Sequence, residues 1–193
     1  MPDDMVTGWH FICADHTTGQ GNLKVEVGQT LTVEGRLILC KHGLHACRWL
    51  LDALEYAPGP VACKVEVWGD IIEEDDKLCG RNRKCLGMVD ATSILHEFTC
   101  RCAERAMQRG LEAGRESHLD ELTAAWVTAR NTAWLAARDA TRAATGDAAS
   151  NAAWCGAWDA ERDWQNAELE RMLEEAIANV HSGHAMLHKW LRQ

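Results

Sequence analysis

The densest group of reactive side chains lies in the segment CKHGLHAC, which places Cys40, His42, His45 and Cys47 within eight residues. Thiolates and imidazoles are typical zinc ligands, but structural sites usually take two ligands from one turn and two from a distant element. If residues 43–47 form a strand, His45 and Cys47 share a face while His42 lies in a turn, so one ion would not reach all four side chains. We therefore favour no metal. We expect both cysteines in the core and His42 exposed; in the remaining alternative, His45 contacts a ligand in a cleft.

Sequence signatures of common catalytic sites are missing: the chain has no GxSxG, P-loop, GxGxxG or HExxH motif. His184 and His188 are four residues apart without the glutamate that zinc hydrolysis needs, so we interpret them as a surface or interface pair. Cys100 and Cys102 are expected within one helix, where they point in different directions and do not form a redox pair. We expect Cys102 in the core, and the sequence does not predict catalysis.

Short segments rich in Val, Ile, Thr and Cys must position the reactive side chains, and they predict strands at residues 6–15, 23–27, 30–33, 37–40 and 61–69. In the last of these, alternation predicts Val61, Cys63, Val65 and Val67 on one face. Helical spacing predicts a helix at 48–56, which the following Pro-Gly-Pro segment ends. The acidic run 70–76 and the basic run 80–84 are both expected in an exposed hairpin or loop.

The second half of the chain has a different composition. A helix is expected from residue 90 to about residue 110, with Ile94, Leu95, Phe98, Cys102 and Ala106 on one stripe. Residues 115–180 then hold eighteen Ala and five Trp without any Pro, which predicts two helices with a break near residues 145–147. Recurring Ala residues allow close packing, and Trp supplies bulk between helices. We expect a helical hairpin that mediates self-association, with interface residues Trp126, Trp134, Trp154 and Trp158.

Charge and cysteine content restrict the partners and the compartment. The formal net charge of −9 argues against non-specific binding of nucleic acid, because the surface repels a phosphate backbone. No run of about 20 apolar residues is present, so we expect no membrane span. The acidic N-terminus does not resemble a secretory signal, and nine cysteines are typical of unpaired thiols in a reducing compartment. We therefore expect a cytoplasmic protein.

Four segments carry a resemblance to a family of phage and prophage proteins without an assigned activity. They are GWHF at residues 8–11, CKHGLHAC at 40–47 with its CxxGxHxC pattern, LDALEY at 51–56 and VEVWGDII at 65–72. Members of that family often carry an Ala- and Trp-rich helical tail, as this chain does. The resemblance implies a phage-type accessory protein, located in the cytoplasm of a bacterial host cell.

A more remote resemblance is to ADP-ribosyltransferase folds. In those folds a polar residue on an early strand, and a Gly-rich strand followed by a helix with Ala and Tyr, hold the nicotinamide and ribose of NAD. His10, the Gly-Leu-His45 segment, Ala53 and Tyr56 occupy similar places here. The resemblance implies that a later glutamate stabilises the transition state, and Glu66 or Glu73 could serve by position. The chain lacks the Gln/Glu-x-Glu signature.

These patterns together predict an α+β domain at residues 1–110, with a small mixed or antiparallel sheet and packed helices, and an Ala/Trp-rich helical hairpin within residues 111–193. The leading hypothesis is a phage-type accessory protein for host takeover or counter-defence that binds a host protein or a small nucleotide-like ligand. An ADP-ribosyltransferase-like enzyme using NAD is the alternative, and a purely structural or interaction protein is the third. No cofactor is favoured. The candidate ligand-binding residues are His10, His45, Tyr56, Glu66 and Glu73.

Overall fold

The computed structural model describes residues 4–112, 142, 145–146 and 158–190, and its fold is α+β. The chain divides into two compact units: Met1–Asp90 with Leu173–Gln193, and Ala91–Met172. The sequence predicts a boundary at residue 110, which stays a prediction. All the strands among the described residues lie in the first unit.

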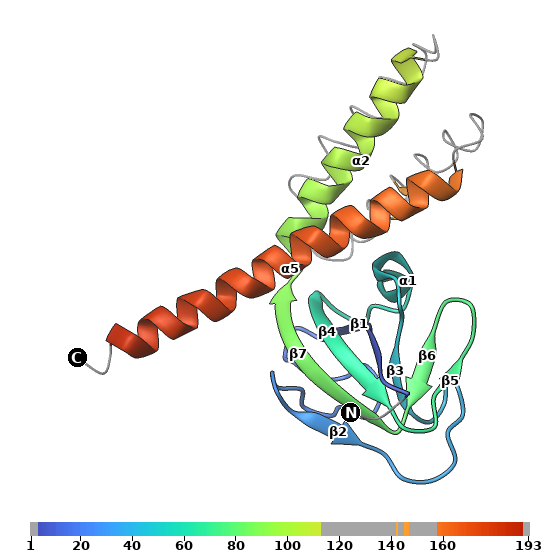
Figure 1. The fold of residues 1–193 in the computed structure, drawn as a ribbon, viewed down its shortest axis with the longest axis vertical. Coiled ribbons are helices and arrows are strands. Elements are labelled where there is room, and N and C mark those ends of the chain that lie inside the picture. Colours follow the sequence, from blue (N-terminus) through green and yellow to red (C-terminus); the bar gives the residue numbers. More distant parts are fainter. Residues whose placement is uncertain (1–3, 113–141, 143–144, 147–157, 191–193) are drawn as a thin grey trace. The chain divides into compact units, whose positions relative to one another are not determined.

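The first unit contains two antiparallel sheets, labelled in Figure 1. One sheet has the order β1 (Val6–Ile12), β4 (Val61–Trp68), β7 (Asn82–Asp90) and β2 (Thr30–Thr32). The other has the order β3 (Leu44–Ala46), β6 (Leu78–Gly80) and β5 (Ile72–Glu73). A short helix, α1 (Leu50–Glu55), follows β3. The backbones of Trp9 and Cys47 exchange two hydrogen bonds of 2.8 and 2.9 Å, which link β1 to the end of β3.

Strand β4 has the predicted alternation. Val61, Cys63, Val65 and Val67 are all at most 4% exposed and belong to one core cluster. Lys64 and Glu66 point to the other face and are half-buried. The pairing registers extend this core-facing surface to β1 and β7, because directly opposite residues in antiparallel strands share a face.

The prediction of an exposed basic loop at residues 80–84 is wrong. Strand β6 ends at Gly80, and β7 begins at Asn82 between β4 and β2. The run of charges alternates between the two faces of β7, so Arg83 is only 4% exposed while Lys84 is half-buried on the opposite face. The acidic run 70–76 does lie in an exposed hairpin that includes β5.

Two other predicted strands are loops. Residues 23–27 and 37–40 form only isolated bridges, Thr17 with Lys24 and Ile38 with His42. Left-handed backbone at Asn22 and Cys40, with φ of 47° and 64°, turns the chain at these points instead of extending it. Strand β1 is also shorter than expected and ends at Ile12.

In the second unit, α2 (Thr92–Glu112) packs antiparallel to the first part of α5 (Trp158–Trp190). Arg101 pairs with Glu168 and Arg105 pairs with Glu161, so the pairing runs in opposite chain directions. The predicted stripe of α2 is confirmed at four of its positions, which are buried, whereas Ile94 is half-buried. The four buried residues are Leu95, Phe98, Cys102 and Ala106.

The later part of α5 belongs to the first unit and contacts the sheet there. Gly87 on β7 lies against Ile177, and a Cβ at residue 87 would be 2.4 Å from Ile177 Cγ2. Lys64 on β4 pairs with Glu174 and also lies over the ring of Trp9, 5.4 Å from its centroid. Glycine at position 87 therefore gives the helix its close approach to β7.

Most of the predicted Ala/Trp hairpin lies outside the described residues. Trp126, Trp134 and Trp154 all lie outside the described residues, and the side chain of Trp158 is not described either. The same holds for the side chains of His184 and His188. Within residues 4–112, 142, 145–146 and 158–190, no helix has the length and apolarity needed to span a bilayer.

Candidate functional site

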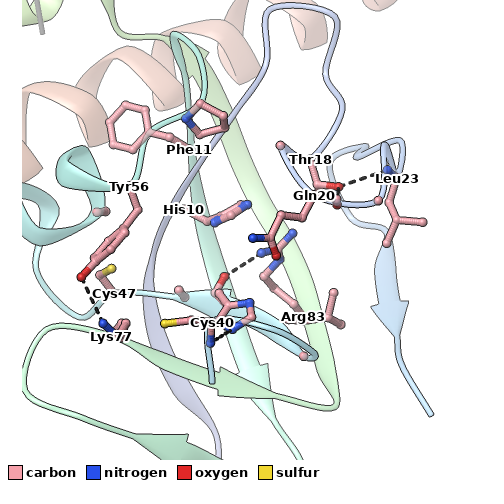
Figure 2. A pocket seen from close by; sticks show the side chains of 18 of the residues that line it. His10, Phe11, Thr18, Gln20, Leu23, Cys40, Cys47, Tyr56, Lys77 and Arg83 are labelled. Atoms are coloured by element: carbon pink, nitrogen blue, oxygen red, sulfur yellow. Dashed lines mark hydrogen bonds between the residues drawn. The ribbon is translucent and has the colours of Figure 1, made fainter. Parts of the chain in front are cut away.

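A pocket of about 550 Å³ lies in the first unit, with its walls drawn from β1, β3, α1, β7 and the loops around residues 20 and 41. Figure 2 shows His10 and Arg83 facing the same space, with Gln20 extending into it from the loop above. That loop is closed by Thr18, whose hydroxyl accepts a hydrogen bond from the Leu23 N–H at 3.1 Å. The fold therefore brings together side chains from segments more than 70 residues apart.

His10 lies on the core-facing side of β1, directly opposite Cys63 of β4. Its Nε2 atom is buried and has no hydrogen-bond partner among the described residues. Burial lowers the pKa of His10 well below its ordinary value of 6.5, and the nearby Arg83 and His45 lower it further. The ring is therefore neutral at pH 7 and keeps an unused polar atom at the pocket.

Arg83 lies on the same face, because it is paired with Val67 in the register of β4 and β7. Its Nη1 donates a hydrogen bond of 2.6 Å to the carbonyl oxygen of His45. Burial lowers the pKa of Arg83 to about 10, so the guanidinium still carries its charge at pH 7. No described Asp or Glu forms an ion pair with it.

His45 has a structural role in the wall of the pocket. Its Nε2 accepts a hydrogen bond of 2.9 Å from the backbone N–H of Cys40, which holds the turn at residues 40–45 closed. Burial lowers the pKa of His45, and Arg83 and Lys77 add to that effect, while a hydrogen bond with the Gly43 backbone opposes it. His45 is therefore neutral at pH 7, and its ring makes hydrogen bonds with the backbone of Cys40 and Gly43 within the turn.

Tyr56 and Lys77 form the rim. Lys77 Nζ donates to the Tyr56 hydroxyl at 3.2 Å and lies 5.1 Å from the ring centroid. The hydroxyl donates in turn to the carboxylate of Asp76. Hydrogen bonding to Tyr56 raises the pKa of Lys77, which also forms ion pairs with Asp76 at 3.5 Å and Glu74 at 3.9 Å. The rim therefore holds a cation with carboxylates beside it.

The charged residues lining the pocket are all basic. Lys41, Lys77 and Arg83 belong to the lining, and no Asp or Glu is among the described residues that line it. This differs from the chain as a whole, which has 29 acidic and 20 basic residues. The lining is therefore basic in an acidic protein, with Lys77 paired to Asp76 just outside the lining.

The structure separates the predicted ligand-binding residues into two groups. His10, His45 and Tyr56 line one pocket, but Glu66 and Glu73 are not among its lining residues. Glu66 is on the opposite face of β4 from Cys63, and the Glu73 carboxylate accepts a hydrogen bond of 2.8 Å from Arg48. The Arg48 guanidinium lowers the pKa of Glu73, so this carboxylate is an ionised surface group.

Both histidines among the four candidate metal ligands are engaged in hydrogen bonds. His42 Nε2 lies 2.7 Å from the carbonyl oxygen of Glu34, and His45 Nε2 is bonded to the Cys40 backbone. Burial raises the pKa of Cys47 to about 12, which disfavours the thiolate that binds zinc. Among the residues described, no three His, Cys, Asp or Glu side chains are grouped to hold a metal ion.

Of the predicted burial in this segment, Cys47 is confirmed in the core and His42 is exposed as expected. The prediction for Cys40 is wrong, because this residue is exposed at the tip of the turn. Sequence reasoning also missed Gln20, Lys77 and Arg83 in the pocket wall. For Arg83 a usable signal existed, because it precedes Cys85 by two residues and so shares the face of a buried cysteine.

The part of the chain that forms the sheets and the pocket also matches a known protein family. Residues 6–97 match a family model described as a domain of unknown function, DUF7666. The matched segment contains every described strand and every residue that lines the pocket. Searches of curated proteins and of solved structures find no match. The chain is thus similar to a domain family whose description assigns no activity.

Proposed function

We propose that the protein is a phage-type accessory protein that binds a small nucleotide-like anion in the pocket of its first unit. The observation that carries this proposal is the charge of the lining, which holds Lys41, Lys77 and Arg83 and no described acidic residue. A basic site within a chain of net charge −9 concentrates anions locally even though the whole protein repels them.

The apolar part of the lining supports a ligand that also has a ring. Leu23, Val33, Leu44, Ala53 and Pro58 line the pocket beside the basic groups. The volume of about 550 Å³ is within the range of small-molecule sites, in which apolar walls supply contact area and a few polar groups fix orientation. A nucleotide combines the two features, because a phosphate is joined to a flat, weakly polar base.

The alternative is an ADP-ribosyltransferase-like enzyme that uses NAD. It is supported by the shared pocket of His10, His45 and Tyr56, which the resemblance to those folds pairs with NAD binding. The described lining supplies no carboxylate to stabilise an oxocarbenium-like transition state, since Glu66 and Glu73 lie outside it. Binding is therefore the better supported of the two functions.

Binding of a host protein and self-association through the helical region both stay predictions. The residues that would carry them, Trp126, Trp134, Trp154 and Trp158, have no described side chains. Sedimentation of the full chain and of a Trp158→Ala variant tests self-association directly. A change from oligomer to monomer is the expected result.

The test of the proposed function is a thermal-shift titration of the full chain. The ligands are nucleoside monophosphates, cyclic nucleotides, ADP-ribose and NAD at millimolar concentration, each compared with the matching uncharged nucleoside. A ligand present at 100 times its Kd should add about 2.7 kcal/mol to the free energy of unfolding. We expect a rise in Tm with at least one phosphorylated ligand and a much smaller rise with its nucleoside. Equal responses, or no response to any ligand, would overturn the proposal.

A further inference from the structure

Arg83 differs in burial and in partners from the described arginines that form ion pairs. Arg48, Arg81, Arg101, Arg105 and Arg171 each form an ion pair with a carboxylate, and their side chains are 34–47% exposed. Arg83 is 4% exposed, yet among the described residues its side chain makes a single hydrogen bond, to the His45 carbonyl oxygen. Burying a charge without a countercharge is costly, so a buried guanidinium normally has a negative partner.

Among the described residues, the groups that influence the pKa of Arg83 are thiols and not carboxylates. A hydrogen bond with Cys63 and the charge of Arg83 lower the pKa of Cys85, so this thiol is a nearby group that can become negative. While protonated, Cys85 Sγ donates a hydrogen bond of 3.6 Å to the Gly87 carbonyl oxygen. His10 and His45 are neutral or positive at every pH. The guanidinium therefore has no carboxylate partner within the described part of the chain.

A second polar group points into the same space. His10 Nε2 is buried and unpartnered among the described residues, and Figure 2 shows the His10 ring and the Arg83 side chain facing one cavity. Arg83 has five N–H donors and uses one of them on His45. The remaining donors, with a neutral imidazole that can donate from Nε2, match the several acceptor oxygens of one oxyanion.

We propose that Arg83 and His10 form a buried oxyanion-binding site that takes the phosphate or carboxylate group of the ligand. This inference rests on the proposed function for the identity of the whole ligand, but the oxyanion site stands on the geometry of these two residues. The anionic group binds at the Arg83 end of the pocket, and the ring of the ligand lies along the apolar wall. Lys77 at the rim attracts the anion but is already engaged by Tyr56 and Asp76.

The chain offers a matched control for Arg83. Lys84 is the next residue of β7, carries the same charge and points to the opposite face of the sheet. Arg83→Met and Lys84→Met therefore lower the net charge equally, but only the first removes a cation from the pocket. Arg83→Lys keeps the charge and removes the planar fork, so it tests the site even if Arg83→Met fails to fold.

The experiment measures binding of inorganic phosphate, acetate and adenosine monophosphate to the full chain by calorimetry. We expect phosphate or acetate to bind the wild type and Lys84→Met equally. Arg83→Lys and His10→Gln should weaken binding of the same anion by about tenfold or more, since a hydrogen bond to a charged group is worth that much. Whichever of inorganic phosphate and acetate binds more tightly identifies the preferred oxyanion as phosphate or carboxylate.

The outcomes separate this inference from the proposed function. If inorganic phosphate or acetate binds through Arg83 but no nucleotide binds, the oxyanion site stands and the nucleotide proposal falls. If adenosine monophosphate binds equally to wild type and Arg83→Lys, the pocket is used but the oxyanion site is wrong. If none of the three anions binds, the oxyanion site is wrong.

Discussion

Gly8 on β1 lies against the backbone at the end of β3, and a single methyl group there should open the pocket. A Cβ at residue 8 would lie 2.5 Å from the carbonyl oxygen of Cys47 and 3.2 Å from its carbonyl carbon. Both atoms are backbone, so a rotamer change cannot relieve the overlap. In Gly8→Ala the two segments must separate by about half an ångström or more before the contact reaches 3.0 Å.

The cost follows from the hydrogen bonds that this separation breaks. Trp9 and Cys47 exchange backbone bonds of 2.8 and 2.9 Å at this point, and both residues are at most 4% exposed. Each bond contributes about 1 kcal/mol, so Gly8→Ala should lower the free energy of unfolding by about 2 kcal/mol. His10 follows on β1 and His45 precedes Cys47, so the same movement should weaken ligand binding.

Urea denaturation of the full chain measures the stability, and calorimetry with the anions named above measures the binding. Thr7→Ala is the control, because Thr7 is an exposed neighbour on β1 and its loss should change stability by about 0.5 kcal/mol or less. If Gly8→Ala is as stable as Thr7→Ala and binds anions equally well, the close approach of β1 and β3 is not a property of the folded protein.

Three further variants test other parts of the molecule. Because the pKa of His10 is below its ordinary 6.5 when folded, the unfolded chain binds more protons, and stability should fall as pH drops below about 6.5. His10→Gln should make this fall shallower in urea denaturation at several pH values. Arg105→Met removes the guanidinium 2.8 Å from the buried Glu161 carboxylate and should lower the free energy of unfolding by about 1–3 kcal/mol. Gly87→Val places a side chain against Ile177 and should speed amide hydrogen exchange in α5 around that residue.

Each of these expectations can fail in a definite way. An unchanged pH slope in His10→Gln would mean that the ring titrates like an exposed histidine. Arg105→Met with wild-type stability would mean that Glu161 finds other partners at no cost. Unchanged exchange in Gly87→Val would contradict the packing of α5 on β7.

The local sequence pattern was sufficient to predict some helices and strands but not others. Strand β4 was predictable because its alternation of apolar and polar residues is complete in itself, and α1 was predictable because Pro58 and Pro60 limit it. Strand β7 was not predictable in the same way, since its first residues are polar and charged. Its central place depends on pairing with β4 and β2, which are distant in sequence. A charged residue on a central strand can be buried, whereas the same residue in a loop is solvated.

The same contrast explains which site residues were found. His10 and His45 were candidates by residue type, and their common pocket depends on the pairing of β1 with the end of β3. Glu66 could have been excluded once the β1–β4 register was known, because His10 is opposite Cys63 and Glu66 alternates away from Cys63. Arg83 was missed because a run of basic residues in sequence is ordinarily a solvated surface.

Net charge and local charge have different physical consequences for this protein, and the position of Arg83 shows why both must be considered. The total of −9 describes the potential far from the molecule, where it opposes binding to a nucleic acid backbone. Within the pocket the interactions are short-range and less screened by water, so one buried guanidinium outweighs acidic residues on the distant surface.

Salt dependence distinguishes the two effects. Screening weakens long-range repulsion more than a buried contact, so affinity for a small anion should change little between low and physiological salt. A steep loss of affinity over that range would place the binding cations at the exposed rim, at Lys41 and Lys77, and not at Arg83.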